Sequence, residues 1–122
     1  MSREAVVRSY LKAMERSDLE GVCACFEPDG MVKSPVYGAV AVRPFYERLF
    51  ADTERAEVNL YCLYVGADQP ERLAAHFGYV WLKTNGSRVE TDLVDLFQFR
   101  PGSELIAHLS IIFDTAAKTP AG

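Results

Sequence analysis

The spacing of hydrophobic residues changes near residue 52, and this change constrains the fold more than any other feature of the sequence. Before that point, apolar residues such as Val6, Tyr10 and Met14 recur at the intervals of an amphipathic helix. After it, β-branched and aromatic residues dominate, as is typical of strands. The patterns predict helices over 4–16, 17–26 and about 42–52, and strands over 31–35, 58–65, 73–84, 88–100 and 105–115.

Turn signals indicate how these elements are connected. Asn85-Gly86 lies between two predicted strands, and both residues tolerate the positive φ that a tight hairpin turn requires. Pro101-Gly102 marks the next turn. Ser17 and Glu20 have the spacing of a capping box at the start of the second helix. Three helices followed by sequential antiparallel strands predict an α+β domain whose helices cover one face of the sheet.

Composition and charge narrow the possible partners. The 122 residues suit a single domain, 1–122, and a net charge of −4 without a Lys/Arg cluster argues against nucleic-acid binding. No apolar run reaches the roughly 18 residues of a membrane span, and the N-terminus lacks the apolar region of a signal peptide. Cys23, Cys25 and Cys62 lack a metal-binding spacing. We therefore expect a cytoplasmic protein with free thiols, no metal and no cofactor.

Asp95 is the residue that best fits a chemical role. Strand alternation places it on the apolar face of its strand, whereas the polar residues of the segment fall on the other face. The apolar neighbours are Leu93, Phe97 and Phe99, and the polar residues are Glu90, Asp92 and Gln98. A carboxyl group among aromatic rings is costly unless it is paired or protonated, so a satisfied structural Asp and a ligand-binding neutral Asp both remain open.

Five segments in order resemble the bacterial Δ5-3-ketosteroid isomerases, members of the NTF2-like superfamily with SnoaL-like relatives. They are Val6-Val7-Arg8-Ser9-Tyr10, Ser17-Asp18-Leu19-Glu20-Gly21, Val32-Lys33-Ser34-Pro35-Val36, Pro44-Phe45-Tyr46 and Val94-Asp95-Leu96-Phe97-Gln98-Phe99. The resemblance covers about residues 5–113. It implies a cone in which three N-terminal helices pack on a strongly curved, mostly antiparallel sheet around a pocket for a small hydrophobic molecule.

The resemblance also implies roles for individual residues. Tyr10 matches the tyrosine that donates to the steroid enolate oxygen, Asp95 the protonated aspartate beside it, and Tyr46 the tyrosine that supports the first. Together they would form an oxyanion hole. The expected ligand-binding positions are Phe45, Val58, Gly78, Val80, Leu82, Phe97, Phe99, Leu109 and Phe113.

The sequence departs from the family at the general base. The family has an Asp immediately before the proline of its first strand, whereas this chain has Ser34. A serine hydroxyl without a base does not shuttle a proton between two carbons at neutral pH. Classical isomerase activity should therefore be weak or absent. His76 is a substitute base if it points inward with Gly78, although a structural histidine is the alternative.

The sequence is compatible with three functions. The first is an enzyme acting on a steroid- or polyketide-like carbonyl or phenolic compound through Tyr10 and Asp95. The second is a non-catalytic ligand-binding or dimeric scaffold module, since fold does not settle function. The third, an epoxide hydrolase or cyclase, lacks a convincing Asp-Arg-Asp constellation in this sequence.

A homodimer is also expected. If the alternate residues of the 73–84 strand face the pocket, an apolar set on the same strand faces outward and needs covering. This set contains Phe77, Tyr79 and Trp81, and Ile106 and Ile112 add to it from the last strand.

Overall fold

In the computed structural model, residues 1–35 and 38–113 are described, and they form three helices and six strands. The helices are α1 (Arg3–Glu15), α2 (Leu19–Ala24) and α3 (Val42–Ala51). The strands are β1 (Phe26–Ser34), β2 (Gly38–Ala41), β3 (Thr53–Val65), β4 (Arg72–Lys83), β5 (Arg88–Phe99) and β6 (Ile106–Ile112). All six strands form one sheet in the order β2-β1-β6-β5-β4-β3.

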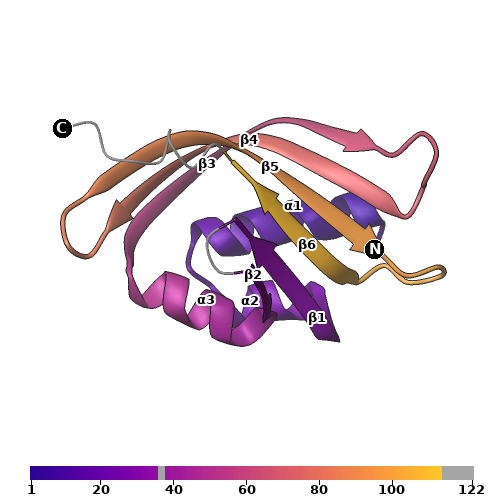
Figure 1. Ribbon diagram of the computed structural model, residues 1–122, viewed down its shortest axis with the longest axis horizontal. Coiled ribbons are helices and arrows are strands. Elements are labelled where there is room, and N and C mark those ends of the chain that lie inside the picture. Colours follow the sequence, from indigo (N-terminus) through magenta and orange to yellow (C-terminus); the bar gives the residue numbers. More distant parts are fainter. Residues whose placement is uncertain (36–37, 114–122) are drawn as a thin grey trace.

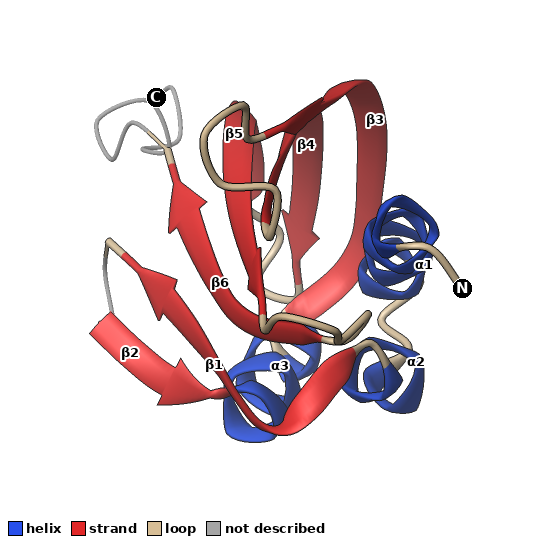
Figure 2. Cartoon of the chain, turned by 90° about the vertical axis from the view of Figure 1, so that its right-hand side faces the viewer, coloured by secondary structure: helices blue, strands red, loops and turns tan. Residues whose placement is uncertain are grey.

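The sheet is strongly curved, and the helices lie on its concave side. The long strands β3, β4 and β5 arch over α1 and α3, and β1 and β2 turn down beside α3 (Figures 1 and 2). Every pair of neighbouring strands is antiparallel except β1 and β6, which are parallel. The predicted α+β cone with a mostly antiparallel sheet is thus confirmed.

The helix starts differ in detail from the sequence prediction. Ser2 caps α1, because its hydroxyl accepts from the amide of Ala5 at 3.1 Å. Asp18, not Ser17, caps α2, with its carboxylate accepting from the Gly21 amide at 3.0 Å. Ser17 has a left-handed φ of 55°, and Glu20 pairs with Arg43 at 2.8 Å instead of reaching back. The capping-box prediction is therefore wrong, because the turn between α1 and α2 uses one more residue.

Strands β1 and β3 begin several residues earlier than predicted. β1 begins at Phe26, one residue beyond the end of α2, with Cys25 between them, and β3 begins at Thr53, with Asp52 between it and α3. The short strand β2 was not predicted; it pairs with the end of β1, where Ser34 lies opposite Gly38. The predicted end of the last strand, beyond 113, lies outside the described residues.

The β4–β5 hairpin decides which side chains enter the concave side. The Lys83 amide donates to the Ser87 carbonyl at 2.9 Å, which leaves three residues, 84–86, in the loop. Gly86 takes the positive φ of 89°, whereas Asn85 does not need one. In the resulting register Phe77 lies opposite Leu93 and Ala75 opposite Asp95. Because directly paired residues share a face, Phe77 faces inward with Asp95.

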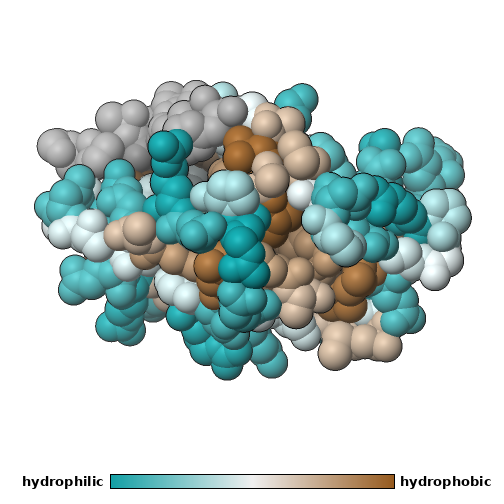
Figure 3. All heavy atoms as spheres, turned by 90° about the horizontal axis from the view of Figure 1, so that it is seen from below, coloured by the Kyte–Doolittle hydropathy of each residue, from teal (hydrophilic) through white to brown (hydrophobic). Residues whose placement is uncertain are grey.

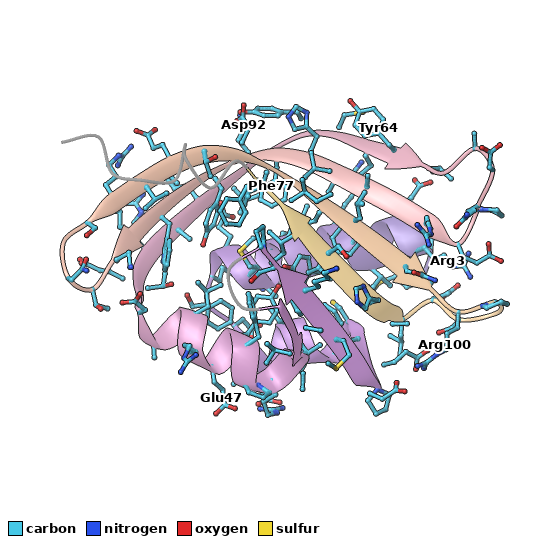
Figure 4. All side chains as sticks on the ribbon, viewed as in Figure 1. Arg3, Glu47, Tyr64, Phe77, Asp92 and Arg100 are labelled. Carbon is cyan, nitrogen blue, oxygen red and sulfur yellow. The ribbon has the colours of Figure 1, made fainter. Side chains whose placement is uncertain are left out.

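This register contradicts the premise of the dimer prediction. Phe77 is completely buried under the sheet, and Tyr79 and Trp81 follow it on the concave face. Figure 4 shows Phe77 on the helix side of the sheet, with Asp92 and Tyr64 on the opposite, convex side. Ile106 is also buried, because a bulge next to Gln98 and Phe99 shifts the β5–β6 register. Ile112 is exposed, as expected.

None of the helices in the described part of the chain is long and apolar enough to cross a membrane.

Candidate functional site

A cavity of about 170 Å³ lies between the concave face of the sheet and helices α1 and α3. Its walls are mostly aromatic and aliphatic, and few polar groups reach it. The lining residues are Tyr10, Met14, Ser34, Phe45, Tyr46, Leu49, Phe77, Tyr79, Trp81, Val89, Thr91, Leu93, Asp95, Ile111 and Phe113. Seen from below, hydrophobic side chains reach the surface as a strip between hydrophilic ones (Figure 3). An apolar hollow with a few polar groups is the usual form of a small-molecule site.

Asp95 is the buried carboxyl group of this cavity. It is 2% exposed, and its Oδ1 atom has no hydrogen-bond partner within the described residues. Burial raises the pKa of Asp95 to about 8, because the charged form loses its hydration. At pH 7 the group is therefore mostly the neutral acid, which carries a proton to donate and an oxygen to accept.

Tyr10 and Tyr46 meet beside the cavity. Tyr10 comes from α1 and Tyr46 from α3, both are 1% exposed, and their hydroxyl groups are hydrogen-bonded to each other. Burial, followed by the neighbouring Tyr46 and Asp95, raises the pKa of Tyr10 well above its ordinary value. Burial and then Asp95 likewise raise the pKa of Tyr46. Both phenols therefore stay protonated at neutral pH and supply hydroxyl groups, not phenolates.

Ser34 lies at the end of β1 and lines the same cavity, where it is 8% exposed. The structure thus brings Tyr10, Tyr46, Asp95 and Ser34 around one hollow from four different elements. Two of the expected ligand-binding residues, Phe45 and Phe113, line it as well.

Four predicted site residues face away from this hollow. His76, Gly78, Val80 and Leu82 alternate with the inward residues of β4 and lie on the convex face. The ring of Tyr61 packs on His76, with ring centroids 4.9 Å apart, and the Tyr61 hydroxyl donates to Asp92 at 3.0 Å. The placement of His76 as an inward substitute base, and of the other three as pocket residues, is therefore wrong.

The remaining predicted ligand-binding residues belong to the surrounding core. Phe97, Phe99 and Leu109 are buried but do not line the cavity. Phe97 packs edge-on against Tyr10, with centroids 5.5 Å apart, and Phe99 lies under the guanidinium of Arg3 at 5.3 Å. Val58 packs against the core from β3, opposite Tyr79. Phe97 therefore supports the Tyr10 wall of the site from behind.

Sequence reasoning missed the β4 wall of the cavity. Tyr79, Trp81 and, from β5, Thr91 all line it. Burial and then Asp95 raise the pKa of Tyr79, so its hydroxyl group is also protonated. The signal that identifies this wall is the three-residue length of the hairpin loop, which sets the face of every β4 side chain.

Within the described residues, no group of three or more His, Cys, Asp and Glu side chains is arranged to hold a metal ion.

Residues 7–108 match the SnoaL-like domain family. Because this match spans most of the chain, the protein belongs to that family. No curated protein matches its sequence significantly.

Solved structures of low sequence identity have the same fold. An NTF2-like protein of unknown function from Burkholderia pseudomallei K96243 is 21% identical, with 98% of this chain and 99% of that chain covered and a TM-score of 0.79. SalBIII, an epoxide hydrolase/cyclase-like enzyme in pyran ring formation in the polyether salinomycin, is 17% identical. The match covers 94% of this chain and 92% of SalBIII, with a TM-score of 0.77. TerC, co-crystallized with polyporic acid, is 15% identical. The match covers 94% of this chain and 93% of TerC, with a TM-score of 0.77.

Proposed function

We propose that this SnoaL-like protein binds a small hydrophobic compound through a carbonyl or phenol oxygen, which accepts a hydrogen bond from neutral Asp95 inside the cavity. The observation that carries this proposal is the buried carboxyl group of Asp95, whose Oδ1 has no hydrogen-bond partner among residues 1–35 and 38–113. A buried polar atom without a partner is costly, and a ligand that satisfies it recovers that cost on binding.

Tyr10 is the second donor in this proposal. If Tyr46 donates to the Tyr10 oxygen, the proton of Tyr10 is left for the ligand. Two neutral donors in an apolar site stabilise a developing enolate oxygen, as an oxyanion hole does.

The cavity volume narrows the ligand class. A dry apolar cavity of about 150 Å³ holds one benzene ring, and this cavity has about 170 Å³. The ligand part that reaches Asp95 is therefore a single ring bearing one oxygen, such as a cyclic ketone or a phenol. A steroid- or polyketide-like compound would enter with one terminal ring.

Classical isomerase activity is proposed to be weak. Among the described lining residues, Asp95 is the one acid, and it is held neutral, so it is a poor base at pH 7. The same argument weighs against an epoxide hydrolase, which must activate water. A non-catalytic binding module is the alternative function, and the absence of a base in the described lining favours it.

We also propose a homodimer, now through the convex face of the sheet. Tyr64, Ala74, Leu96 and Ser110 form a row across β3, β4, β5 and β6. Tyr64 and Leu96 are 53% and 40% exposed, and Ile112 lies nearby at 48%. A second copy would cover this apolar surface. Sedimentation should give a dimer that Leu96→Glu dissociates, and a monomeric wild type would refute the assembly.

A reducing cytoplasm, consistent with three free cysteines, is the proposed location.

Calorimetric titration with phenol and benzene tests the binding proposal. The two ligands share a ring and differ in one hydroxyl group, so their ratio of dissociation constants isolates the polar contact. We expect phenol to bind about 10-fold more tightly, and Asp95→Ala and Tyr10→Phe each to reduce that ratio. Asp92→Ala, on the convex face of the same strand, is the matched control and should leave the ratio unchanged. Equal binding of phenol and benzene to the wild type would refute the assignment.

A further inference from the structure

A second hollow adjoins the cavity. It has about 360 Å³ and lies along the outer side of α3. Its lining residues are Val40, Pro44, Phe45, Arg48, Leu49, Asp52 and Trp81. Three of them, Phe45, Leu49 and Trp81, also line the inner cavity. These three side chains therefore form the wall between the two hollows.

Trp81 differs from the other wall residues in how it is held. Its indole nitrogen donates to the Thr53 hydroxyl oxygen at 2.8 Å, and that hydroxyl donates to the Leu49 carbonyl of α3 at 2.6 Å. The Thr53 hydroxyl thus ties the indole to the end of the helix. On the same ring, the Lys83 ammonium lies 4.7 Å from the centroid and 3.3 Å from the carboxylate of Asp52.

We propose that Trp81 is the size-selecting residue of the site, a wall held closed by Thr53. While the indole is held, the inner cavity accepts a single ring. When the indole turns away, the hollows join and accept an elongated compound of two or more rings, whose far end lies beside Arg48 and Asp52. This inference rests on the proposed function, because it assumes that a ligand ring occupies the inner cavity.

The dimensions support this assignment. Ligand pockets are typically about 300–1,000 Å³, and the inner cavity of about 170 Å³ lies below that range. The joined hollows fall within it. The free-energy cost of releasing the indole from Thr53 is small, because one net hydrogen bond changes an equilibrium by only about 2- to 12-fold. A ligand with a second ring offsets the lost hydrogen bond by burying apolar area in the outer hollow.

Thr53→Val tests the proposal with little change of shape, because it removes the hydroxyl group and keeps the branched side chain. Thr53→Ser is the control that retains the hydroxyl. The probes are phenol, with one ring, and 4-phenylphenol, with two, and calorimetry gives the ratio of their dissociation constants. We expect Thr53→Val to shift this ratio about 2- to 12-fold toward 4-phenylphenol. Thr53→Ser should match the wild type, and Trp81→Leu should shift the ratio at least as far as Thr53→Val.

Trp81 is the one tryptophan of the chain, so its fluorescence reports the wall directly. Acrylamide should quench Thr53→Val more strongly than the wild type or Thr53→Ser in the absence of ligand. If phenol binds every variant but neither the ratio nor the quenching changes, the size-selecting role is overturned and the proposed function stands. If neither phenol nor 4-phenylphenol binds the wild type or Thr53→Val, the proposed function fails and this inference fails with it.

Discussion

The two faces of β5 place two aspartates in opposite environments. Asp92 lies on the convex face, where its carboxylate accepts a hydrogen bond from the Tyr61 hydroxyl at 3.0 Å. Asp95, three residues later, is 2% exposed on the concave face, and one of its oxygens has no hydrogen-bond partner in the described part of the chain. The residue type is the same, and only the side of the sheet differs. The comparison indicates that the concave face, not the aspartate itself, gives the site its chemistry.

The largest effect should come from adding a base to the concave face. Ser34→Asp should raise the isomerisation of cyclohex-3-en-1-one about 10²- to 10⁴-fold, because a positioned general base contributes a factor of this size. This one-ring substrate suits the cavity, and absorbance of the conjugated product measures the rate. Because Asp95 must remain protonated to donate its hydrogen bond, the rate of Ser34→Asp should fall above about pH 8.

Ser34→Asn is the matched control, since it has a similar size and no base, and it should leave the rate low. A fast wild-type enzyme would contradict the absence of a base among the described residues that line the cavity. His76 would not explain such activity, because it packs against Tyr61 on the convex face.

The second effect is on stability. Folding raises the pKa of Asp95 from the ordinary 3.8 to about 8, so the folded state binds the proton more tightly than the unfolded state. The free energy of unfolding contributed by this group is therefore fully present below about pH 4. It is lost as the pH rises toward 8, by at most about 1.4 kcal/mol per pH unit.

Urea unfolding of the wild type, Asp95→Asn and Asp92→Asn between pH 4 and 9 measures this slope. Asp95→Asn should flatten the decline, because its amide does not titrate, whereas Asp92→Asn should keep it. If the free energies of unfolding of the wild type and Asp95→Asn vary with pH in parallel, folding does not raise the pKa of Asp95. The two faces of β5 would then not differ in their effect on an aspartate.

A smaller effect concerns the two tyrosines. Tyr46→Phe leaves the buried Tyr10 hydroxyl without its protein partner, at a cost of about 1–3 kcal/mol of unfolding free energy. Tyr10→Phe should have a similar cost. The double variant should lose clearly less than the sum, because no buried hydroxyl is then left alone. Additive losses in thermal or urea unfolding would mean that the two hydroxyl groups are not coupled.

The smallest effect should come from the convex face. A Cβ atom at Gly78 would collide with the Tyr61 hydroxyl, which lies at the tip of a half-exposed side chain and can shift into solvent. Gly78→Ala should therefore cost no more than about 1 kcal/mol, and Tyr61→Ala should relieve that cost. Phenol affinity should stay unchanged in both variants. Weaker phenol binding by Gly78→Ala would mean that the convex face contributes to the ligand site.

Much of the fold was predictable from local patterns. The helical spacing of Val6, Tyr10 and Met14 and the alternation around Asp95 depend on chain geometry within a few residues. The ordered resemblance to ketosteroid isomerases then led to the cone. It also led to Tyr10, Tyr46, Ser34 and Asp95, which the structure places around one cavity, although their roles remain predictions.

The face of β4 was not predictable in the same way. Alternation separates Phe77, Tyr79 and Trp81 from His76 and Gly78, but it does not say which set faces inward. A two-residue turn at Asn85-Gly86 would place His76 opposite Asp95. The three-residue loop places Ala75 there, and a slip of one residue moves every side chain to the other face.

The sequence by itself therefore determined the elements other than β2, their order and the apolar setting of Asp95, because these depend on periodicity and turn chemistry. The tertiary structure alone decided the β4 wall, the buried position of Ile106 and the contact of Trp81 with Thr53. The physical reason is that these features depend on pairing between strands and helices distant in sequence. In such pairings, one additional loop residue or one bulge moves the side chains of a whole strand to the opposite face of the sheet.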